Sequence, residues 1–248
     1  MKLSIVLPTY NEAGNIIDLI EGIRANVDPE GWQYEMIVVD DNSPDGTGEA
    51  VRQHTLATAA PVRLIVRTDE RGLATAIRRG IEAAQGEIVV VMDTDFNHSP
   101  TLIPQMTKFL QYYDLVIGSR FVMDGGMEDL TRYYFSYLYN FFVRVILRTQ
   151  VQDNLSGFFA MRHEKLMSMD FDRIFFGYGE YFMRLLFLSW KRCYKMLEVP
   201  VFYQLRRHGQ SKSRFVAMLR DYTLTVLRLR MTYGPAPKNR QANNHASR

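Results

Sequence analysis

The sequence predicts an α/β fold built on a mostly parallel sheet that is flanked by helices. Short apolar runs of strand length alternate with segments of helical periodicity through the first half of the chain. Strands that are joined by a helix need a right-handed crossover, which makes neighbouring strands parallel. The chain has 248 residues, 47% of them hydrophobic, and this size suits one large domain better than two independent ones.

The strands and helices of the first half follow one another in strict alternation. The strands are expected at 3–7, 35–39, 62–66 and 87–92, with helices at 15–25, 49–54 and 73–84 between them. A fifth strand, at 115–117, runs into Gly118-Ser119-Arg120-Phe121. This order is typical of a parallel sheet of the nucleotide-binding type.

The composition changes beyond Gly125-Gly126, where the chain becomes aromatic and basic. We expect one domain over residues 1–233, in which this change separates a first half, residues 1–122, from a second half, residues 123–233. Residues 234–248 begin with Gly-Pro-Ala-Pro and continue with polar side chains, which predicts a disordered tail.

Two segments of the second half predict amphipathic helices near the C-terminus. The aromatic segment 133–147 carries Arg144 and is flanked by Arg132 and Arg148. It falls short of the ~18 uninterrupted apolar residues of a membrane-spanning helix, so it is either a core helix or a helix that lies in a membrane interface. The segment 215–233 combines an apolar face with several arginines, which suits anionic headgroups.

Charge and cysteine content narrow the classes of function. The formal net charge of +3 is modest, so we expect no nucleic-acid partner. The single cysteine, Cys193, excludes an internal disulfide and a cysteine-based zinc site, and it fits a reducing compartment. The apolar run at the amino terminus is too short for a signal peptide. These observations favour a cytoplasmic protein.

Acidic side chains follow the fourth predicted strand directly. The apolar run ends at Met92 and continues as Asp93-Thr94-Asp95, with Asn97 two residues further and Pro100 closing off regular structure. In open α/β sheets ligands bind at the carboxyl ends of the strands, and two carboxylates at that edge suit a hard divalent cation. The alternative is a solvated turn, because Asp and Asn are ordinary turn residues.

The first two strands also end in polar side chains. Pro8-Thr9-Tyr10-Asn11-Glu12 follows the first strand, and Asp40 and Asp41 follow the second. A carboxylate there can accept the paired N–H groups of guanine or the single imide N–H of uracil, while Tyr10 packs on the base. We expect Asp40 and Asp41 to contact a ligand, because two buried like charges are costly without a partner. Asp45 is expected to serve a turn and a helix cap.

These stretches and several others resemble glycosyltransferase family two, which has the Rossmann-like GT-A fold. They are most similar to the polyprenol-phosphate glycosyltransferases, the subgroup of the dolichol-phosphate mannose synthases. The matching stretches, in the family's order, are Leu7-Pro8-Thr9-Tyr10-Asn11-Glu12, Val39-Asp40-Asp41-Asn42-Ser43-Pro44-Asp45-Gly46-Thr47, Glu70-Arg71-Gly72-Leu73, Met92-Asp93-Thr94-Asp95, Gly118-Ser119-Arg120-Phe121, Ser156-Gly157-Phe158-Phe159-Ala160, Glu198-Val199-Pro200 and Arg206-Arg207-His208-Gly209-Gln210-Ser211-Lys212.

The resemblance implies a nucleotide-sugar site and a metal site in the first half, residues 1–122. The residues that it places around the nucleotide sugar are Pro8, Tyr10, Glu12, Asp40, Asp41, Asp93, Thr94, Arg206 and Lys212. It implies that Asp93, Asp95 and Asn97 hold Mg²⁺ or Mn²⁺ on the donor diphosphate. Asn97 stands where relatives often have Gln, so this shorter amide is expected to reach the metal through water.

The resemblance also implies that the second half, residues 123–233, faces the acceptor and the membrane. Arg120, Arg132 and Ser136 match positions that grip the acceptor phosphate, and together with Asp95 they form the expected catalytic set. One stretch departs from the family pattern: Gly177-Tyr178-Gly179-Glu180 does not align cleanly with the relatives' helix start. The membrane helices that some relatives carry at the carboxyl end are also absent from the sequence.

The implied reaction moves a hexose, with inversion, from a nucleotide sugar to a polyprenyl phosphate on the cytoplasmic face of a membrane. Mannose from GDP-mannose is the expected donor, and a small membrane-anchoring subunit is a possible partner. A phosphate with a second pKa near ~6 is already nucleophilic at neutral pH and needs no general base. Three alternatives stay open: UDP-glucose or a UDP-N-acetylhexosamine as donor, a saccharide hydroxyl as acceptor with Asp153 or Glu180 as base, and a catalytically silent nucleotide-binding module.

Overall fold

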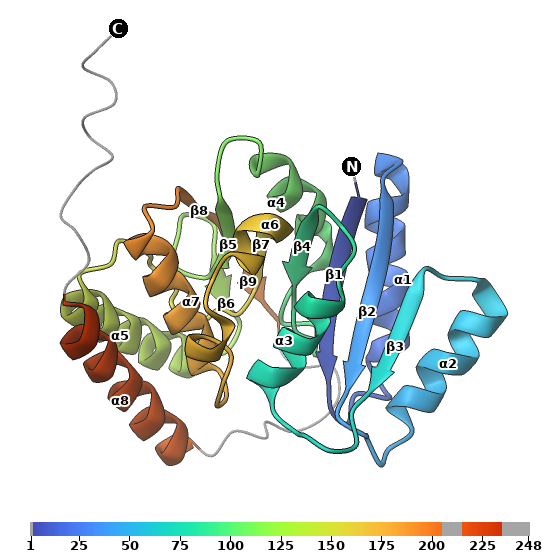
Figure 1. Cartoon of the computed structure of the whole chain (residues 1–248), viewed down its shortest axis with the longest axis horizontal. Coiled ribbons are helices and arrows are strands. Elements are labelled where there is room, and N and C mark those ends of the chain that lie inside the picture. Colours follow the sequence, from blue (N-terminus) through green and yellow to red (C-terminus); the bar gives the residue numbers. More distant parts are fainter. Residues whose placement is uncertain (1, 205–214, 235–248) are drawn as a thin grey trace, which may run out of the picture.

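The computed structural model describes residues 2–204 and 215–234, and its centre is a seven-stranded sheet (Figure 1). The strands lie in the order β3-β2-β1-β4-β7-β5-β8. They are β1 (Lys2–Thr9), β2 (Gln33–Asp40), β3 (Val62–Val66), β4 (Ile88–Val91), β5 (Leu115–Ser119), β7 (Phe159–Arg162) and β8 (Met196–Pro200). A separate parallel pair joins β6 (Gly126–Met127) to β9 (Phe202–Tyr203).

All strand pairs of the large sheet are parallel except the two that involve β7. The mostly parallel α/β sheet predicted from the sequence is therefore confirmed, with each of the five predicted strands in place. Strand β7 was not predicted from the sequence; it lies between β4 and β5 and is antiparallel to both. Its run Phe159–Met161 is fully buried and too short for its periodicity to separate a strand from a helix.

Eight α-helices surround the sheet in the described part of the chain. They are α1 (Ile16–Val27), α2 (Thr47–Thr58), α3 (Leu73–Ala83), α4 (Ile103–Phe109), α5 (Leu130–Leu147), α6 (His163–Met167), α7 (Glu180–Lys191) and α8 (Phe215–Tyr233). Three short 3₁₀ turns, η1 (Asp28–Glu30), η2 (Pro100–Leu102) and η3 (Phe171–Arg173), extend or precede helical segments. The predicted helices 15–25, 49–54 and 73–84 correspond to α1, α2 and α3.

The central strands β1, β4, β5 and β7 bury both faces, which explains their nearly continuous apolar runs. Leu3, Ile5 and Leu7 of β1 face a core that α1 and α4 complete on one side. Val6 faces a second core, formed with α3 and α7 on the other side. Gly80 of α3 is required at this second contact, since a Cβ there would lie 2.3 Å from a methyl carbon of Val6.

A third apolar cluster joins α5, α7 and α8 at one end of the molecule (Figure 1). Val143 and Leu147 of α5 pack there with Phe187 of α7 and Val226 of α8. Both predicted amphipathic segments are therefore helices that are buried along one side only. None of the helices in 2–204 and 215–234 is long and apolar enough to cross a membrane.

The predicted change of character near residue 122 does not divide the sheet. Strands β7 and β8 come from the second half of the chain, yet β7 pairs with β4 and β8 pairs with β5 of the first half. The two halves therefore share one sheet. Of the predicted tail, residues 235–248 lie outside the described part of the chain.

Candidate active site

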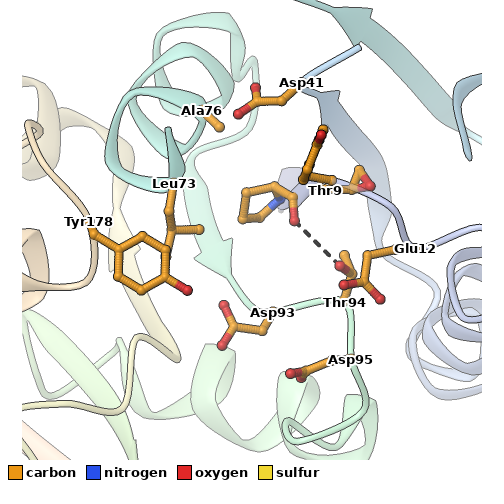
Figure 2. A pocket seen from close by; sticks show the side chains of 11 residues that line it. Thr9, Glu12, Asp41, Leu73, Ala76, Asp93, Thr94, Asp95 and Tyr178 are labelled. Atoms are coloured by element: carbon orange, nitrogen blue, oxygen red, sulfur yellow. Dashed lines mark hydrogen bonds between the residues drawn. The ribbon is translucent and has the colours of Figure 1, made fainter. Parts of the chain in front are cut away.

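A pocket lies at the carboxyl ends of β1, β2 and β4, where the sequence analysis expected a ligand (Figure 2). Figure 2 shows Asp41 at one end of the pocket and Asp93 with Asp95 at the other. The lining residues are Pro8, Thr9, Tyr10, Glu12, Asp41, Leu73, Ala76, Asp93, Thr94, Asp95 and Tyr178. Seven of the eleven lining positions were predicted nucleotide-sugar or metal residues, so three strand ends do converge on one site.

Asp41 is held by a buried arginine that the sequence analysis did not assign. Its Oδ1 accepts Arg67 Nε at 2.7 Å and also Arg67 Nη2, and the two side chains are 8% and 7% exposed. Its Oδ2 accepts the main-chain N–H of Gly72 at 2.8 Å. Asp41 therefore enters the pocket as a charge-compensated carboxylate with a fixed orientation, and Oδ2 keeps room for one further donor.

Tyr10 forms part of the pocket wall, and Arg71 packs against it. The Arg71 guanidinium lies 4.7 Å above the centre of the Tyr10 ring, and its Nη1 donates to the Tyr10 hydroxyl at 3.0 Å. Arg71 precedes Gly72, whose φ of 148° belongs to the region that favours glycine. The loop that holds Asp41 thus also positions the arginine beside Tyr10.

Asp40 does not line the pocket. It is 2% exposed and accepts the Ser43 main-chain N–H at 3.1 Å and the Ser43 hydroxyl, so it orders the turn after β2. Asp45 accepts the N–H of Thr47, the first residue of α2, at 3.0 Å, and the N–H of Ala13 at 3.0 Å. The predicted turn role of Asp45 is confirmed, whereas the N-cap residue of α2 is Gly46.

The last residues of β1 and the residues just after it line the middle of the pocket. The Pro8 carbonyl accepts the Thr94 hydroxyl at 3.4 Å, and the Glu12 carboxylate accepts the Asn15 amide at 2.8 Å. Thr9, which the sequence analysis did not assign, is 4% exposed. Its hydroxyl has no hydrogen-bond partner within the described residues. A buried polar atom in this state is satisfied when a ligand supplies the partner.

Asp93 and Asp95 form the acidic end of the pocket. Asp95 is 5% exposed, and its two oxygens accept the Asn97 main-chain N–H at 3.2 Å and the Asn97 side-chain amide at 2.7 Å. Phe96 between them has a φ of 63°, a left-handed turn that brings Asn97 back over Asp95. Asn97 does not line the pocket, and its amide nitrogen orients a carboxylate.

The donor set at this end suits Mg²⁺ or Mn²⁺. Two carboxylates face the same pocket, and such cations take oxygen ligands while keeping positions for water and phosphate. Nowhere in the described ranges do three or more His, Cys, Asp or Glu side chains gather as a metal cluster. The residues therefore fit a cation that a bound diphosphate helps to hold, and they do not form a closed structural site.

His98 lies beneath this acidic loop and is fully buried. Its Nδ1 accepts the Asp93 main-chain N–H at 2.9 Å, and its Nε2 lies 2.7 Å from the Tyr203 hydroxyl. Burial lowers the pKa of His98 to about 4, so the ring is neutral at neutral pH. Both ring nitrogens of His98 are therefore used in hydrogen bonds inside the protein.

Arg120 is buried and paired, whereas the resemblance implies a role at an acceptor phosphate. Its Nε and Nη2 donate to the two carboxylate oxygens of Asp153 at 2.7 and 2.8 Å. The guanidinium lies 4.7 Å from the centre of the Tyr203 ring. Asp153 is fully buried, and the ion pair keeps the pKa of Arg120 above its ordinary value despite the opposing effect of burial. Neither residue lines the pocket.

The remaining predicted site residues lie away from the pocket or outside the described part of the chain. Arg132 is exposed near the start of α5, where its main-chain N–H donates to the capping carboxylate of Asp129 at 3.0 Å. Ser136 lies one turn later, and its carbonyl accepts the Asn140 amide at 2.9 Å. Arg206 and Lys212 belong to residues 205–214, which are not described.

Tyr178 occupies the stretch that departs from the family pattern and closes one side of the pocket (Figure 2). Its main-chain N–H donates at 3.1 Å to Glu180, a buried carboxylate at the start of α7. Gly177 has a φ of 75°, and a Cβ there would lie 1.9 Å from a Glu180 oxygen. Glu180, one of two alternative bases, therefore supports the Tyr178 turn and does not line the pocket.

Sequence reasoning missed Arg67, Thr9 and Tyr178. Arg67 follows the third predicted strand directly, and the same position after a strand drew attention to the acidic residues. An isolated arginine, however, is usually a surface residue. Thr9 lay inside a quoted stretch without a role. Tyr178 enters the pocket through a loop whose path no strand pattern predicts.

Comparisons with known proteins agree with this geometry. The sequence model of the family described as Glycosyl transferase family 2 matches residues 4–169. The dolichol-phosphate mannosyltransferase of Pyrococcus furiosus is 36% identical over 226 residues, which cover 86% of this chain and 59% of that protein. The dolichol-phosphate mannosyltransferase of Saccharomyces cerevisiae is 34% identical over 171 residues, which cover 67% and 62%. The chain thus spans about three fifths of the length of these two relatives.

A third relative matches over most of both chains. The undecaprenyl-phosphate mannosyltransferase of Micrococcus luteus is 33% identical over 220 residues, which cover 86% of this chain and 87% of that protein. Among solved structures, glucosyl-3-phosphoglycerate synthase from Mycobacterium tuberculosis with Mn²⁺, UDP and glucosyl-3-phosphoglycerate has a TM-score of 0.71 at 24% identity, covering 92% of this chain and 79% of that chain. A structure of the same enzyme with Mg²⁺ and UDP has a TM-score of 0.68 at 25% identity, with coverages of 92% and 79%. These likenesses confirm the predicted GT-A fold.

Proposed function

The chain belongs to glycosyl transferase family 2, and on that premise we propose that it transfers mannose from GDP-mannose to a polyprenyl phosphate. The three relatives described above are all mannosyltransferases whose names specify dolichol phosphate or undecaprenyl phosphate. The acceptor that these names share is a phosphate on a polyprenyl chain. We therefore expect this chain to use a polyprenyl phosphate as acceptor and mannose as the transferred sugar.

The polarity of the pocket carries the proposal. One end presents Asp41, which Arg67 orients, and Tyr10, on which Arg71 packs. The Thr9 hydroxyl at this end has no hydrogen-bond partner among residues 2–204 and 215–234. The other end presents Asp93 and Asp95. The first end offers hydrogen-bond acceptors and an aromatic surface for a base, and the second offers carboxylates for a cation on the diphosphate. A nucleoside diphosphate sugar has this same sequence of groups.

In the proposed reaction an oxygen of the acceptor phosphate attacks the anomeric carbon, and the bond to the nucleoside diphosphate breaks with inversion. A cation held by Asp93 and Asp95 would supply electrostatic stabilisation of the charge that develops on the diphosphate. Asn97 keeps Asp95 in a fixed rotamer through its amide at 2.7 Å. Because the attacking phosphate is already anionic, the chain needs groups that orient it and no general base.

We assign the orientation of the acceptor to the side of the pocket near β5 and α5. Arg132 and Ser136 lie on successive turns at the start of α5, and Arg132 is exposed to incoming anions. Arg120 contributes indirectly, because its buried ion pair with Asp153 fixes the end of β5. Asp153 is committed to that pair, which argues against the alternative in which it serves as base for a saccharide hydroxyl.

We also propose that the enzyme works as a peripheral protein on the cytoplasmic face of a membrane. The aromatic and aliphatic side chains that α5 exposes are Leu130, Tyr134, Phe135, Tyr137, Leu138, Phe141 and Val145, each at least 47% accessible. Exposed Arg132 and Arg148 flank this face, which suits a helix in the headgroup region. A small anchoring subunit would add to this contact in the cell.

A UDP-sugar is the second candidate donor, and one observation favours it. Oδ1 of Asp41 already accepts two donors from Arg67, and Oδ2 accepts Gly72 and keeps room for one more. One further donor matches the single imide N–H of uracil, while guanine would bring two adjacent N–H groups. The bound nucleotide in the structural relatives described above is UDP.

The test is a screen of GDP-mannose, UDP-glucose and UDP-N-acetylglucosamine with a short polyprenyl phosphate and either Mg²⁺ or Mn²⁺. We expect lipid-linked mannose from GDP-mannose, and a loss of roughly a hundredfold or more in turnover for Asp95→Ala. Asp18→Ala, an exposed aspartate on α1, is the control and should keep full activity. Product from UDP-sugars alone would transfer the assignment to the second candidate, and unchanged turnover in Asp95→Ala would contradict both.

A further inference from the structure

The ring of His98 has its tautomer fixed by its neighbours. Because a main-chain N–H can only donate, the Asp93 amide at 2.9 Å requires an unprotonated Nδ1. The neutral ring then carries its proton on Nε2, which donates to the Tyr203 oxygen at 2.7 Å. The Tyr203 hydroxyl donates in turn to the Ser156 carbonyl at 3.1 Å. The main-chain N–H of Asp93 thus leaves the neutral His98 ring with one arrangement of protons.

Packing also holds the His98 ring in place. The His98 ring stacks on Phe158 at a centroid distance of 4.8 Å and an interplanar angle of 17°. It meets the edge of Tyr203 at 5.1 Å. His98 and Phe158 are fully buried, and Tyr203 is 6% exposed. The imidazole thus packs between the acidic loop after β4 and the short strand β9.

The same tyrosine contacts the pair at the end of β5. The Arg120 guanidinium lies 4.7 Å from the centre of the Tyr203 ring and is bidentate with Asp153. A continuous set of buried contacts therefore runs from the Asp93 main chain through His98 and Tyr203 to Arg120. These contacts join the acidic end of the pocket, at Asp93 and Asp95, to the side that we assign to the acceptor phosphate.

We propose that His98 is a positioning residue that, through its Nδ1 acceptor and its bond to Tyr203, fixes the Asp93 main chain for cation binding and couples it to Arg120. The ring lies behind the acidic loop and contacts the Asp93 main chain, so it acts through the carboxylate loop and touches no substrate. The cation role rests on the proposed function, whereas the hydrogen-bond arrangement does not. A residue that supports metal ligands in this way typically changes metal affinity by roughly ten- to a hundredfold when it is replaced.

The first experiment needs no ligand. Nitrogen NMR of the imidazole in the metal-free protein should show an unprotonated Nδ1 and a protonated Nε2 in His98. The Asp93 amide should exchange slowly in the wild type and at least tenfold faster in His98→Gln, which places no acceptor at the Nδ1 position. A proton on Nδ1, or equal exchange in the two proteins, would overturn the inference.

The second experiment separates positioning from general loss of structure. The variants are His98→Asn, whose amide oxygen can replace Nδ1, His98→Gln, which reaches toward Tyr203 only, and Tyr203→Phe. Calorimetric Mn²⁺ titration in the presence of GDP, and again with UDP, should give an affinity about tenfold weaker or more in His98→Gln. His98→Asn should stay within about threefold of the wild type, although both variants lose the stacked ring and melt at similarly lowered temperatures. Tyr203→Phe should weaken Mn²⁺ binding by a smaller factor than His98→Gln.

His163→Gln is the matched control, since it also removes a histidine hydrogen bond, which joins the His163 ring to the Ile81 carbonyl at 3.1 Å. His163 follows Arg162, which pairs with Ile88 at the start of β4, whereas the acidic loop follows the end of β4. His163→Gln should leave Mn²⁺ affinity unchanged. Equal affinities in His98→Asn and His98→Gln, or affinities that follow melting temperature across all four variants, would overturn the inference. A wild-type protein that binds neither nucleotide with Mn²⁺ would contradict the proposed function, while the imidazole and amide-exchange measurements would still decide the hydrogen-bond arrangement.

Discussion

At the scale of single residues, this site is built from charges that are compensated before a ligand arrives. Asp41 and Arg120 each enter the site region with a buried partner, Arg67 and Asp153 respectively. A buried ion pair contributes little net stability compared with apolar residues, but loss of one partner leaves an uncompensated charge and is costly. The pairs therefore fix orientation more than they stabilise the fold.

Arg67→Met tests this account at the base end of the pocket. Asp41 would stay buried without its cation, so we expect the free energy of unfolding to fall by about 3–5 kcal/mol in urea titrations. GDP or UDP affinity should fall as well, because Asp41 and the Gly72 loop lose a common anchor.

A double variant and an exposed pair control the measurement. Arg67→Met with Asp41→Asn should recover part of the lost stability, since no charge is left unpaired, but no nucleotide affinity. Arg52→Met breaks the exposed pair with Glu49 and should cost at most about 1 kcal/mol. A cost for Arg67→Met as small as that of Arg52→Met would contradict the account.

At the scale of elements, α5 has one side that packs in the protein interior and another apolar side that is exposed. Val143 and Leu147 pack against α7 and α8, while Tyr134, Leu138 and Phe141 recur at helical spacing on the exposed side. The sequence analysis left a core helix and an interface helix as alternatives. The structure shows a buried side and an exposed apolar side on the same helix.

Replacement of the exposed side tests the proposed membrane contact. Leu138→Glu with Phe141→Glu should lower binding to vesicles that contain anionic lipid by roughly tenfold or more, because each apolar side chain contributes about 1.5–3 kcal/mol when it is buried. The free energy of unfolding should change by no more than about 0.5 kcal/mol, since both positions are exposed.

The control for this helix is Leu56→Glu on α2, because Leu56 is 83% exposed. Helices α2 and α5 lie on opposite sides of the molecule (Figure 1). Vesicle binding of Leu56→Glu should equal that of the wild type in sedimentation assays. Equal binding of the α5 double variant and the Leu56 variant would exclude α5 as the contact surface.

At the scale of the whole molecule, the sheet order brings distant parts of the chain to one edge. Glu198 on β8 accepts the main-chain N–H groups of Gln152 and Asp153 at 2.8 and 3.0 Å, and Asp153 holds Arg120 at the end of β5. Burial raises the pKa of Glu198 above its ordinary value of 4.5, against the lowering effect of these hydrogen bonds. As the pH rises past 4.5, Glu198 therefore keeps its proton longer in the native state than in the unfolded chain.

This shift predicts a pH dependence of global stability. In the window that begins at the ordinary pKa of 4.5, the native protein binds more protons than the unfolded chain, so the Glu198 contribution to stability falls as the pH rises. Urea unfolding at a series of pH values should show this decline in the wild type and a flatter profile in Glu198→Gln. Glu49→Gln is the opposite control, because the hydrogen bond from Arg52 lowers the pKa of Glu49, so the Glu49 contribution to stability grows as the pH rises toward 4.5 and changes little above it. A steeper decline in Glu198→Gln would contradict the prediction.

The sequence by itself determined the alternation of strands and helices, and with it the edge at which Asp41, Asp93 and Asp95 meet. That information is local, because apolar periodicity and polar strand ends can be identified within a few residues. Apolar periodicity did not assign the antiparallel strand β7, since its pairing with β4 and β5 depends on contacts far apart in the chain.

Only the tertiary structure decided which charges face a ligand and which face each other. Asp40 and Asp41 are neighbours in sequence, yet Asp40 orders its own turn and Asp41 lines the pocket beside Arg67. Arg120 lies in a stretch that matches the family and His98 follows the acidic loop, but their partners Asp153 and Tyr203 lie 33 and 105 residues away in the chain. The orientation of a buried polar group depends on the partners that folding supplies, and no local pattern encodes them.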